Sequence, residues 1–234
     1  MSYIRIENFD LYYESHGTGF PLVLISGFAS GAWIWYRQIA DLSKDFRVIT
    51  FDPRGVAKSK IPDAATISIT AIADDAAHLL DKLNIKKANV LGASFGGTHY
   101  VAPAPEVLMA FAATDYLNSS GRVRKFMLPA FTKEFAEANS GEIEKVCALR
   151  EANRVPENVY LQQLAAATTF DAESRISEIK PETLVLTGDK DLVVPMQNGG
   201  NLARTIQLRA VRLCRMKSPV FLRETICRFC RLTV

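Results

Sequence analysis

Four short strand-like segments, separated by helical patterns, are the feature that most limits how this chain can fold. A continuous apolar run such as residues 21–25 is typical of a strand buried on both faces of a sheet. Helical periodicity lies between them, as in the apolar face that runs from Ile69 to Leu83. Strand–helix–strand order requires crossover connections, so the sequence predicts an α/β fold with a mostly parallel sheet. The four predicted strands are residues 21–25, 46–51, 87–91 and 183–187.

The length of the chain, 234 residues, suits one well-buried domain, and we expect a single domain over residues 1–234. Two more strands are expected near the amino end, at residues 3–7 and 11–15, and a helical stretch at 35–43. Residues 104–178 carry helical periodicities without a strand pattern, which favours a helical lid inserted between strands. The helices expected inside the lid are residues 107–113, 124–138, 142–152 and 159–167.

Composition favours a cytoplasmic protein without a membrane or nucleic-acid partner. The longest apolar run, Val107–Ala113, has seven residues and is too short to span a bilayer. The first residues lack the basic-then-apolar layout of a signal peptide. Four cysteines in a chain of this size do not make a disulfide scaffold, so we expect a reducing compartment.

The carboxyl-terminal segment, residues 207–234, differs in composition from the rest of the chain. It has seven basic residues, one acidic residue and three of the four cysteines. A basic tail can bind nucleic acid or a membrane surface, but no aromatic stacking platform accompanies these arginines. We interpret it as an atypical tail, altered in its reading frame after Ile206. Cys227 and Cys230 have the spacing of half a zinc site, but no second pair or histidine lies nearby, so we expect no metal.

The sharpest local motif is Gly92-Ala93-Ser94-Phe95-Gly96-Gly97, directly after the third predicted strand. Small residues two before and two after a serine allow a tight strand-to-helix turn that exposes its hydroxyl beside the next backbone amide. A helix start with Ser94 as its cap is the structural alternative. A dinucleotide-binding loop would require glycine at 94, where a side chain blocks the approach to a pyrophosphate. We therefore expect no cofactor.

The loops after the four buried strands together resemble those of the α/β-hydrolase superfamily, in particular its capped esterase, enol-lactonase and haloperoxidase-like members. The loops are Ser26-Gly27-Phe28, Asp52-Pro53-Arg54-Gly55, the Ser94 motif, and Gly188-Asp189-Lys190-Asp191 with its later Pro195. The resemblance implies that Ser94 is the nucleophile and that the backbone amides of Phe28 and Phe95 form an oxyanion hole. It also implies that Asp191, four residues before Pro195, is the acid that orients a histidine. Asp189 is the competing acid.

The chain departs from this family in three places. Serine stands at position 26, where the family usually has histidine. Pro103-Ala104-Pro105 interrupts the helix that should follow Gly97, and no strand pattern comes after it, so a segment is missing there and the sheet is incomplete.

The third departure is the absence of any histidine after His99. If residues 208–214 form the last strand and 220–229 the last helix, the catalytic histidine is expected near Ser218-Pro219. The three histidines present are not expected to replace it. His16 belongs to an amino-terminal strand, His78 to the polar side of a helix, and His99 to the helix that leaves the Ser94 turn.

The sequence therefore predicts a serine hydrolase that acts on a small carboxylic ester or lactone through an acyl-enzyme, impaired by the loss of its base. Because no metal ligands cluster, chelators should leave any hydrolysis unchanged. The alternative is a non-catalytic α/β-hydrolase-fold protein that binds a ligand or is inactive.

Overall fold

The computed structural model describes residues 2–63, 65–94, 101–103, 105–112, 120–206 and 212–215. The chain folds into two compact units. The first unit consists of residues 1–96, 114–124 and 140–170, and the second consists of residues 97–113, 125–139 and 171–234. The helices of the expected lid are therefore shared between the two units.

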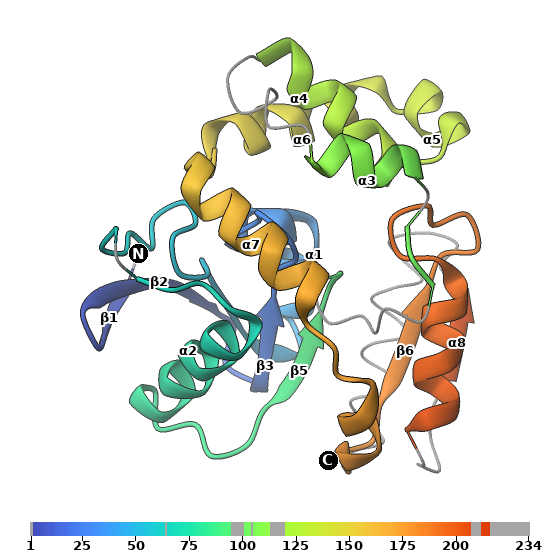
Figure 1. Ribbon diagram of the computed structural model, residues 1–234. Coiled ribbons are helices and arrows are strands. Elements are labelled where there is room, and N and C mark those ends of the chain that lie inside the picture. The colour runs from blue at the N-terminus through green and yellow to red at the C-terminus, as the bar shows by residue number, and fades with distance from the viewer. Residues whose placement is uncertain are drawn as a thin grey trace. The chain divides into compact units, whose positions relative to one another are not determined.

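A five-stranded mixed sheet forms the centre of the first unit (Figure 1). Its spatial order is β1-β2-β4-β3-β5; β1 and β2 pair antiparallel, β2 and β4 also pair antiparallel, and β3 lies parallel to both β4 and β5. All five strands coincide with segments predicted from the sequence. Their bounds are β1 Ser2–Ile6, β2 Phe9–His16, β3 Phe20–Ile25, β4 Phe46–Phe51 and β5 Asn89–Gly92.

The helices of the first unit follow the strands in the predicted order. Helix α2 begins where the Ser68 side chain accepts a hydrogen bond from the Ala71 amide at 3.0 Å, satisfying one of the open donors of the first turn. Its apolar face packs on the sheet, and Leu79 is fully buried in a core with Val23 and Ile49. The helices are η1 Ala32–Trp35, α1 Tyr36–Leu42, α2 Ile69–Lys82, α6 Ser140–Ala152 and α7 Glu157–Thr169.

Strand β5 lies at the edge of the described sheet, and its side chains are less buried than those of β3. Val23 of β3 is 1% exposed, whereas its register partner Val90 of β5 is 62% exposed. A strand in the interior of a parallel sheet would be covered on both faces. Strand β5 is therefore uncovered at the edge of the described sheet, and the missing element after Gly97 stays a prediction.

The second unit contains a two-stranded parallel sheet of β6 and β7, with Thr187 opposite Arg215 at its carboxyl end. Asn198 of α8 is buried, and its side chain bonds both the amide and the carbonyl of Val101, at 2.9 and 2.8 Å. The elements are α3 Pro105–Ala112, η3 Leu128–Ala130, α5 Lys133–Ala138, η4 Glu173–Glu178, β6 Leu184–Thr187, α8 Met196–Thr205 and β7 Arg212–Arg215.

The expected helix over residues 124–138 is divided. Helix α4, Ser120–Met127, spans the boundary between the units and ends before the 3₁₀ turn η3, which contains Pro129. A new helix then starts where the Thr132 hydroxyl accepts from the Phe135 amide at 3.2 Å. Proline ends a helix and threonine caps the next one, which explains the break. None of the helices in the described residues is long and apolar enough to cross a membrane.

Candidate active site

Ser94 and the loop after β3 lie at the same edge of the sheet. Strands β3 and β5 are parallel neighbours with Ile25 opposite Gly92, and the Ala93 amide extends the ladder by donating to the Ile25 carbonyl at 3.1 Å. Ser94, the next residue, has φ +66°, in the left-handed region that residues with a side chain seldom adopt. Such strain costs about 1–3 kcal/mol and concentrates at functional sites.

The side chain of Ser94 lies against Gly27. A Cβ atom added at Gly27 would stand 2.8 Å from the Ser94 Cβ and 3.2 Å from its Oγ. Because contacts under 3.0 Å essentially never occur for real Cβ atoms, only glycine fits here. Position 27 thus brings the backbone of the loop next to the exposed serine.

Residues Gly27–Ser30 form a tight turn beside Ser94. The Ser30 amide donates to the Gly27 carbonyl at 3.2 Å, and Ala29 has φ +48°. The Gly27 carbonyl and the Phe28 N–H belong to one trans peptide unit and point in opposite directions. Since the carbonyl faces into the turn, the Phe28 N–H faces out of it.

Ser26 and Asp52 hold the base of this turn. The buried Ser26 hydroxyl donates to the Gly31 carbonyl at 2.8 Å, which gives the serine at this position a structural role. One oxygen of Asp52 accepts from the Ala32 amide at 2.8 Å, and the other accepts from the Lys58 amide at 3.1 Å. Burial raises the pKa of the Asp52 carboxyl, and the two amide bonds partly oppose that shift.

The candidate acid lies in the second unit. Asp191 follows β6, and its Oδ1 accepts from the amides of Val193 and Val194 at 2.9 and 2.8 Å. Both Asp191 and the competing Asp189 are exposed. In the described geometry, Asp191 shapes its own loop. Phe95, the second oxyanion-hole residue expected from the sequence, lies outside the described residues.

Among the histidines, His16 lies far from Ser94 along the sheet. The ladder aligns His16 with Val48, Val48 with Leu22, and Leu22 with Asn89. Ser94 comes five residues after Asn89, which corresponds to about 16 Å at the rise of a strand. His78 is exposed on α2, and His99 and Pro219 lie outside the described residues.

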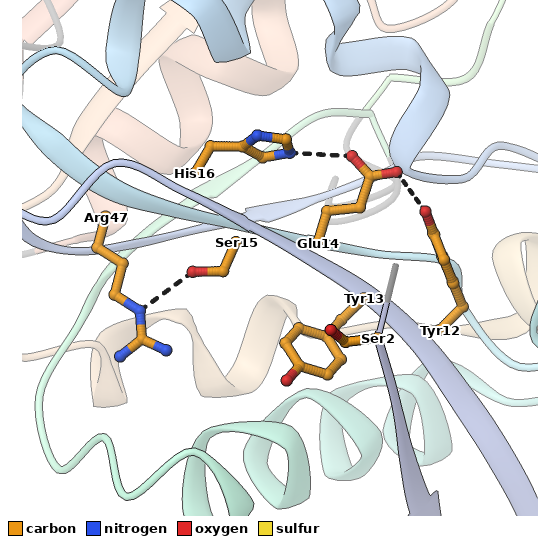
Figure 2. Close-up of a pocket in the computed structure, with 7 residues that line it drawn as sticks. All are labelled: Ser2, Tyr12, Tyr13, Glu14, Ser15, His16 and Arg47. Atoms are coloured by element: carbon orange, nitrogen blue, oxygen red, sulfur yellow. Dashed lines mark hydrogen bonds and ion pairs between the residues drawn. The ribbon is translucent and has the colours of Figure 1, made fainter.

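His16 instead belongs to a polar network that lines a cavity of about 330 Å³ (Figure 2). Glu14 accepts from the Tyr12 hydroxyl at 2.5 Å and contacts the His16 Nε2 at 3.0 Å, as the dashed lines in Figure 2 show. Burial raises the pKa of the Glu14 carboxyl, but the bonds from Tyr12 and His16 outweigh it and the net shift is downward. Ser94 does not line this cavity.

Metal ligands do not gather within the part of the chain that the structure describes: no group of three or more histidine, cysteine, aspartate or glutamate side chains could hold an ion there. Cys147 is a buried free thiol, and its burial raises its pKa. Cys227 and Cys230 lie outside the described residues.

Two polar residues that the sequence analysis did not select also contact the turn. Gln163 of α7 and Arg150 of α6 are buried, and they bond to Ala29 and Ser30 at 2.8 Å each. Gln163 is 134 residues from Ala29 in the sequence and Arg150 is 120 residues from Ser30, so no local sequence pattern predicts either contact.

The chain matches known hydrolases in sequence and in structure. A family model described as alpha/beta hydrolase fold matches residues 21–106. A protein of Azorhizobium caulinodans, provisionally named carbamate hydrolase RutD, is 29% identical over 219 positions, covering 83% of this chain and 82% of that protein. The 2-hydroxymuconate semialdehyde hydrolase of Pseudomonas sp. (strain CF600) is 29% identical over 219 positions, covering 80% and 76%.

The alignment with the Azorhizobium caulinodans protein also contains a gap. The alignment has 219 positions, which is more than the number of residues in 83% of this 234-residue chain. The relative therefore has residues inside the matched region that this chain lacks. A missing internal segment is therefore expected, and its place after Gly97 stays a prediction.

Among solved structures, the enol-lactonase of Burkholderia xenovorans LB400 superposes with a TM-score of 0.83 at 22% identity, over 98% of this chain and 100% of that one. Together the family match, the relatives and the solved structure show that this chain has the α/β-hydrolase fold.

Proposed function

We propose that this chain is a serine hydrolase that acts on a small carboxylic ester or lactone, with Ser94 as the nucleophile. The observation that carries the proposal is the strained φ of +66° at Ser94, together with its contact with Gly27. This geometry exposes a hydroxyl next to a turn whose Phe28 N–H points outward. A simple helix cap does not require a left-handed serine, since capping residues adopt the β region.

In the proposed reaction, Ser94 Oγ attacks the substrate carbonyl and forms a bond to its carbon. The amides of Phe28 and Phe95 donate to the oxyanion of the tetrahedral intermediate. The alcohol portion then leaves, giving an acyl-enzyme, and water attacks the acyl carbon to release the acid and restore Ser94. For a lactone, the leaving alcohol stays attached to the acyl group.

The proposed substrate class is supported by what the similar proteins are named for. The named activities include an enol-lactonase, and a thermophilic esterase from Thermogutta terrifontis superposes with a TM-score of 0.82 at 23% identity. We further propose that the helices of residues 104–178 serve as a lid over the site, within one α/β-hydrolase domain. The contacts of α6 and α7 with the Gly27–Ser30 turn support this role for those two helices.

The missing base limits the proposed activity. Asp191 is the proposed orienting acid, but no histidine follows it in the sequence. The Ser94 proton must then pass to water, and an oxyanion hole with substrate binding alone is worth about 10³–10⁴-fold over the uncatalysed reaction. The absence of this histidine favours the second candidate function, a non-catalytic ligand-binding protein on the same fold.

Covalent labelling with a fluorophosphonate tests the proposal. Ser94 Oγ should displace fluoride, and the phosphonyl adduct should be found on the peptide that contains Ser94 by mass spectrometry. The Ser94→Ala variant should not react, while Ser68→Ala, which removes a helix-capping hydroxyl on the same unit, should leave labelling intact. A folded parent protein that is not labelled, or is labelled equally in Ser94→Ala, would contradict a nucleophilic role and favour the ligand-binding alternative.

A further inference from the structure

The peptide unit that joins Phe28 to Ala29 is held at both of its polar ends. Its N–H, on Ala29, donates to the Oε1 of Gln163 at 2.8 Å. Its carbonyl, on Phe28, accepts from the Ser30 hydroxyl at 3.0 Å, and that hydroxyl accepts in turn from Arg150 at 2.8 Å. A rotation of this peptide plane would break the bonds at both ends.

This peptide needs external support because of its backbone conformation. Ala29 has φ +48°, which a residue with a Cβ adopts only at a cost in strain. Strained residues persist where the surrounding structure fixes them. The Ala29 amide is buried, so its hydrogen bond to Gln163 also replaces contact with water.

Helix α7 contacts the turn through a second residue on the same face. Tyr160 lies three positions before Gln163, and positions three apart are neighbours on a helix surface. Its ring is fully buried and packs edge-on against the ring of Phe28, with centroids 4.7 Å apart and planes at 61°. Tyr160 and Gln163 therefore fix both the side chain and the following peptide of Phe28.

We propose that Gln163 is a positioning residue that sets the direction of the Phe28 N–H for the reaction of Ser94. This inference rests on the proposed function, since it assigns a role to the same turn. Gln163 acts through its hydrogen bond with the Ala29 amide. It acts by holding the turn in the strained form, while Arg150 assists through Ser30. A helix of the proposed lid thus controls the geometry of the oxyanion hole.

The chain provides a matched control next to Gln163. Gln162 lies on the same helix, and its Oε1 accepts from the Ile67 amide at 3.1 Å, away from the turn. Gln163→Leu and Gln162→Leu each replace a glutamine with a side chain of similar volume. Each substitution removes the acceptor of one backbone amide's hydrogen bond. Gln163→Glu keeps a carboxyl oxygen where the Ala29 amide donates and serves as the conservative variant.

The test combines two measurements on the parent and these three variants. The first is the rate of fluorophosphonate labelling at saturating and at low reagent concentration, and the second is hydrogen exchange at the Ala29 amide. We expect Gln163→Leu to lower the maximal labelling rate by about 10–100-fold, less than the 10²–10³-fold typical of deleting an oxyanion donor. The reagent concentration for half-maximal rate should change little. Exchange at Ala29 should accelerate in Gln163→Leu alone, and Gln163→Glu should stay close to the parent.

Each outcome decides between supporting and overturning the inference. Parent-like labelling in Gln163→Leu, or an equal loss of labelling in Gln162→Leu, would overturn it. Unchanged exchange at Ala29 in Gln163→Leu would overturn it whatever the labelling shows. A parent that is not labelled, with faster Ala29 exchange in Gln163→Leu, would contradict the proposed function but support the hold of Gln163 on the turn.

Discussion

Arg54 and Asp75 form a nearly enclosed ion pair that fixes the loop after β4. Two parallel hydrogen bonds of 2.7 Å join the guanidinium to the carboxylate, and the Asp75 side chain is fully buried. Arg54 also donates to the Thr66 carbonyl at 3.1 Å. The hydrogen bonds that Arg54 donates to Asp75 raise the pKa of the guanidinium.

Removal of Arg54 should therefore be costly. We expect Arg54→Met to lower the free energy of unfolding by about 3–5 kcal/mol, because it leaves the Asp75 carboxylate buried without its partner. Arg5→Met is the control, since the Arg5–Asp10 pair is 3.4 Å apart with side chains 62% and 59% exposed, and loss of such a surface pair costs about 0–1 kcal/mol. Urea titrations measure both. Equal losses would mean that the buried pair has no special role.

Glu14 gives the stability of the fold a dependence on pH on the acid side. Its pKa in the folded protein lies below its usual value of 4.5, so the folded state binds fewer protons than the unfolded state in that range. The stabilisation is therefore present above the unfolded pKa and is lost as pH falls through the folded pKa.

Glu14→Gln should remove this part of the pH dependence. Melting temperatures of the parent and the variant, measured from pH 6 down to pH 3, should differ most at pH 6 and converge as the parent's carboxylate is protonated. Asp10→Asn is the control, because that carboxylate is 59% exposed in its side chain. A constant difference across the whole range would contradict the assignment to Glu14.

At the scale of elements, β5 differs from its neighbour β3 in what covers it. Val23 and Val90 are register partners with the same side chain, and their exposed fractions are 1% and 62%. The pair therefore compares a covered and an uncovered position of one parallel ladder. The free energy gained from burial scales with the apolar area removed from water.

We expect Val23→Ala to destabilise the protein by about 1.5–3 kcal/mol, and Val90→Ala by less than about 0.5 kcal/mol. Denaturant midpoints at unchanged slope provide the comparison. A similar cost at both positions would show that Val90 is covered in solution, and that the sheet continues beyond β5.

At the scale of the whole molecule, the tail contributes a strand next to the candidate acid. The sequence predicted a strand over residues 208–214, and β7 is observed at Arg212–Arg215, parallel to β6. Thr187 and Arg215 are register partners in this sheet. Asp191 comes four residues after Thr187 in the sequence, and Pro219 comes four residues after Arg215. The register thus places the carboxyl ends of β6 and β7, at Thr187 and Arg215, at the same edge of the two-stranded sheet.

An imidazole at position 219 should supply the missing base. We expect Pro219→His to raise short-chain ester hydrolysis, since general-base assistance is typically worth about 10²–10⁴-fold where the geometry is favourable. The gain should disappear in the double variant with Ser94→Ala. Pro219→Ala separates the effect of the imidazole from the loss of proline. If Pro219→His is folded by circular dichroism but no faster than Pro219→Ala, position 219 does not reach the site.

The sequence alone determined most of the elements and the candidate nucleophile. Strands and helices follow from local sequence patterns, and β3, β4, β5 and β6 overlap the four strands that these patterns predicted. The glycines around Ser94 predicted the tight turn because only small residues permit it. The helix break at Pro129 also has a local cause, the proline itself, but the helical periodicity continues across it and predicted one helix where two are present.

Only the tertiary structure decided which residues support that nucleophile. Gln163 reaches Ala29 across 134 residues, and Arg150 reaches Ser30 across 120, because α7 and α6 pack on the loop after β3. The local sequence around a buried glutamine in a helix does not predict its hydrogen-bond partner. Its hydrogen bond follows from the requirement that buried polar groups be paired, and packing alone determines which pair forms.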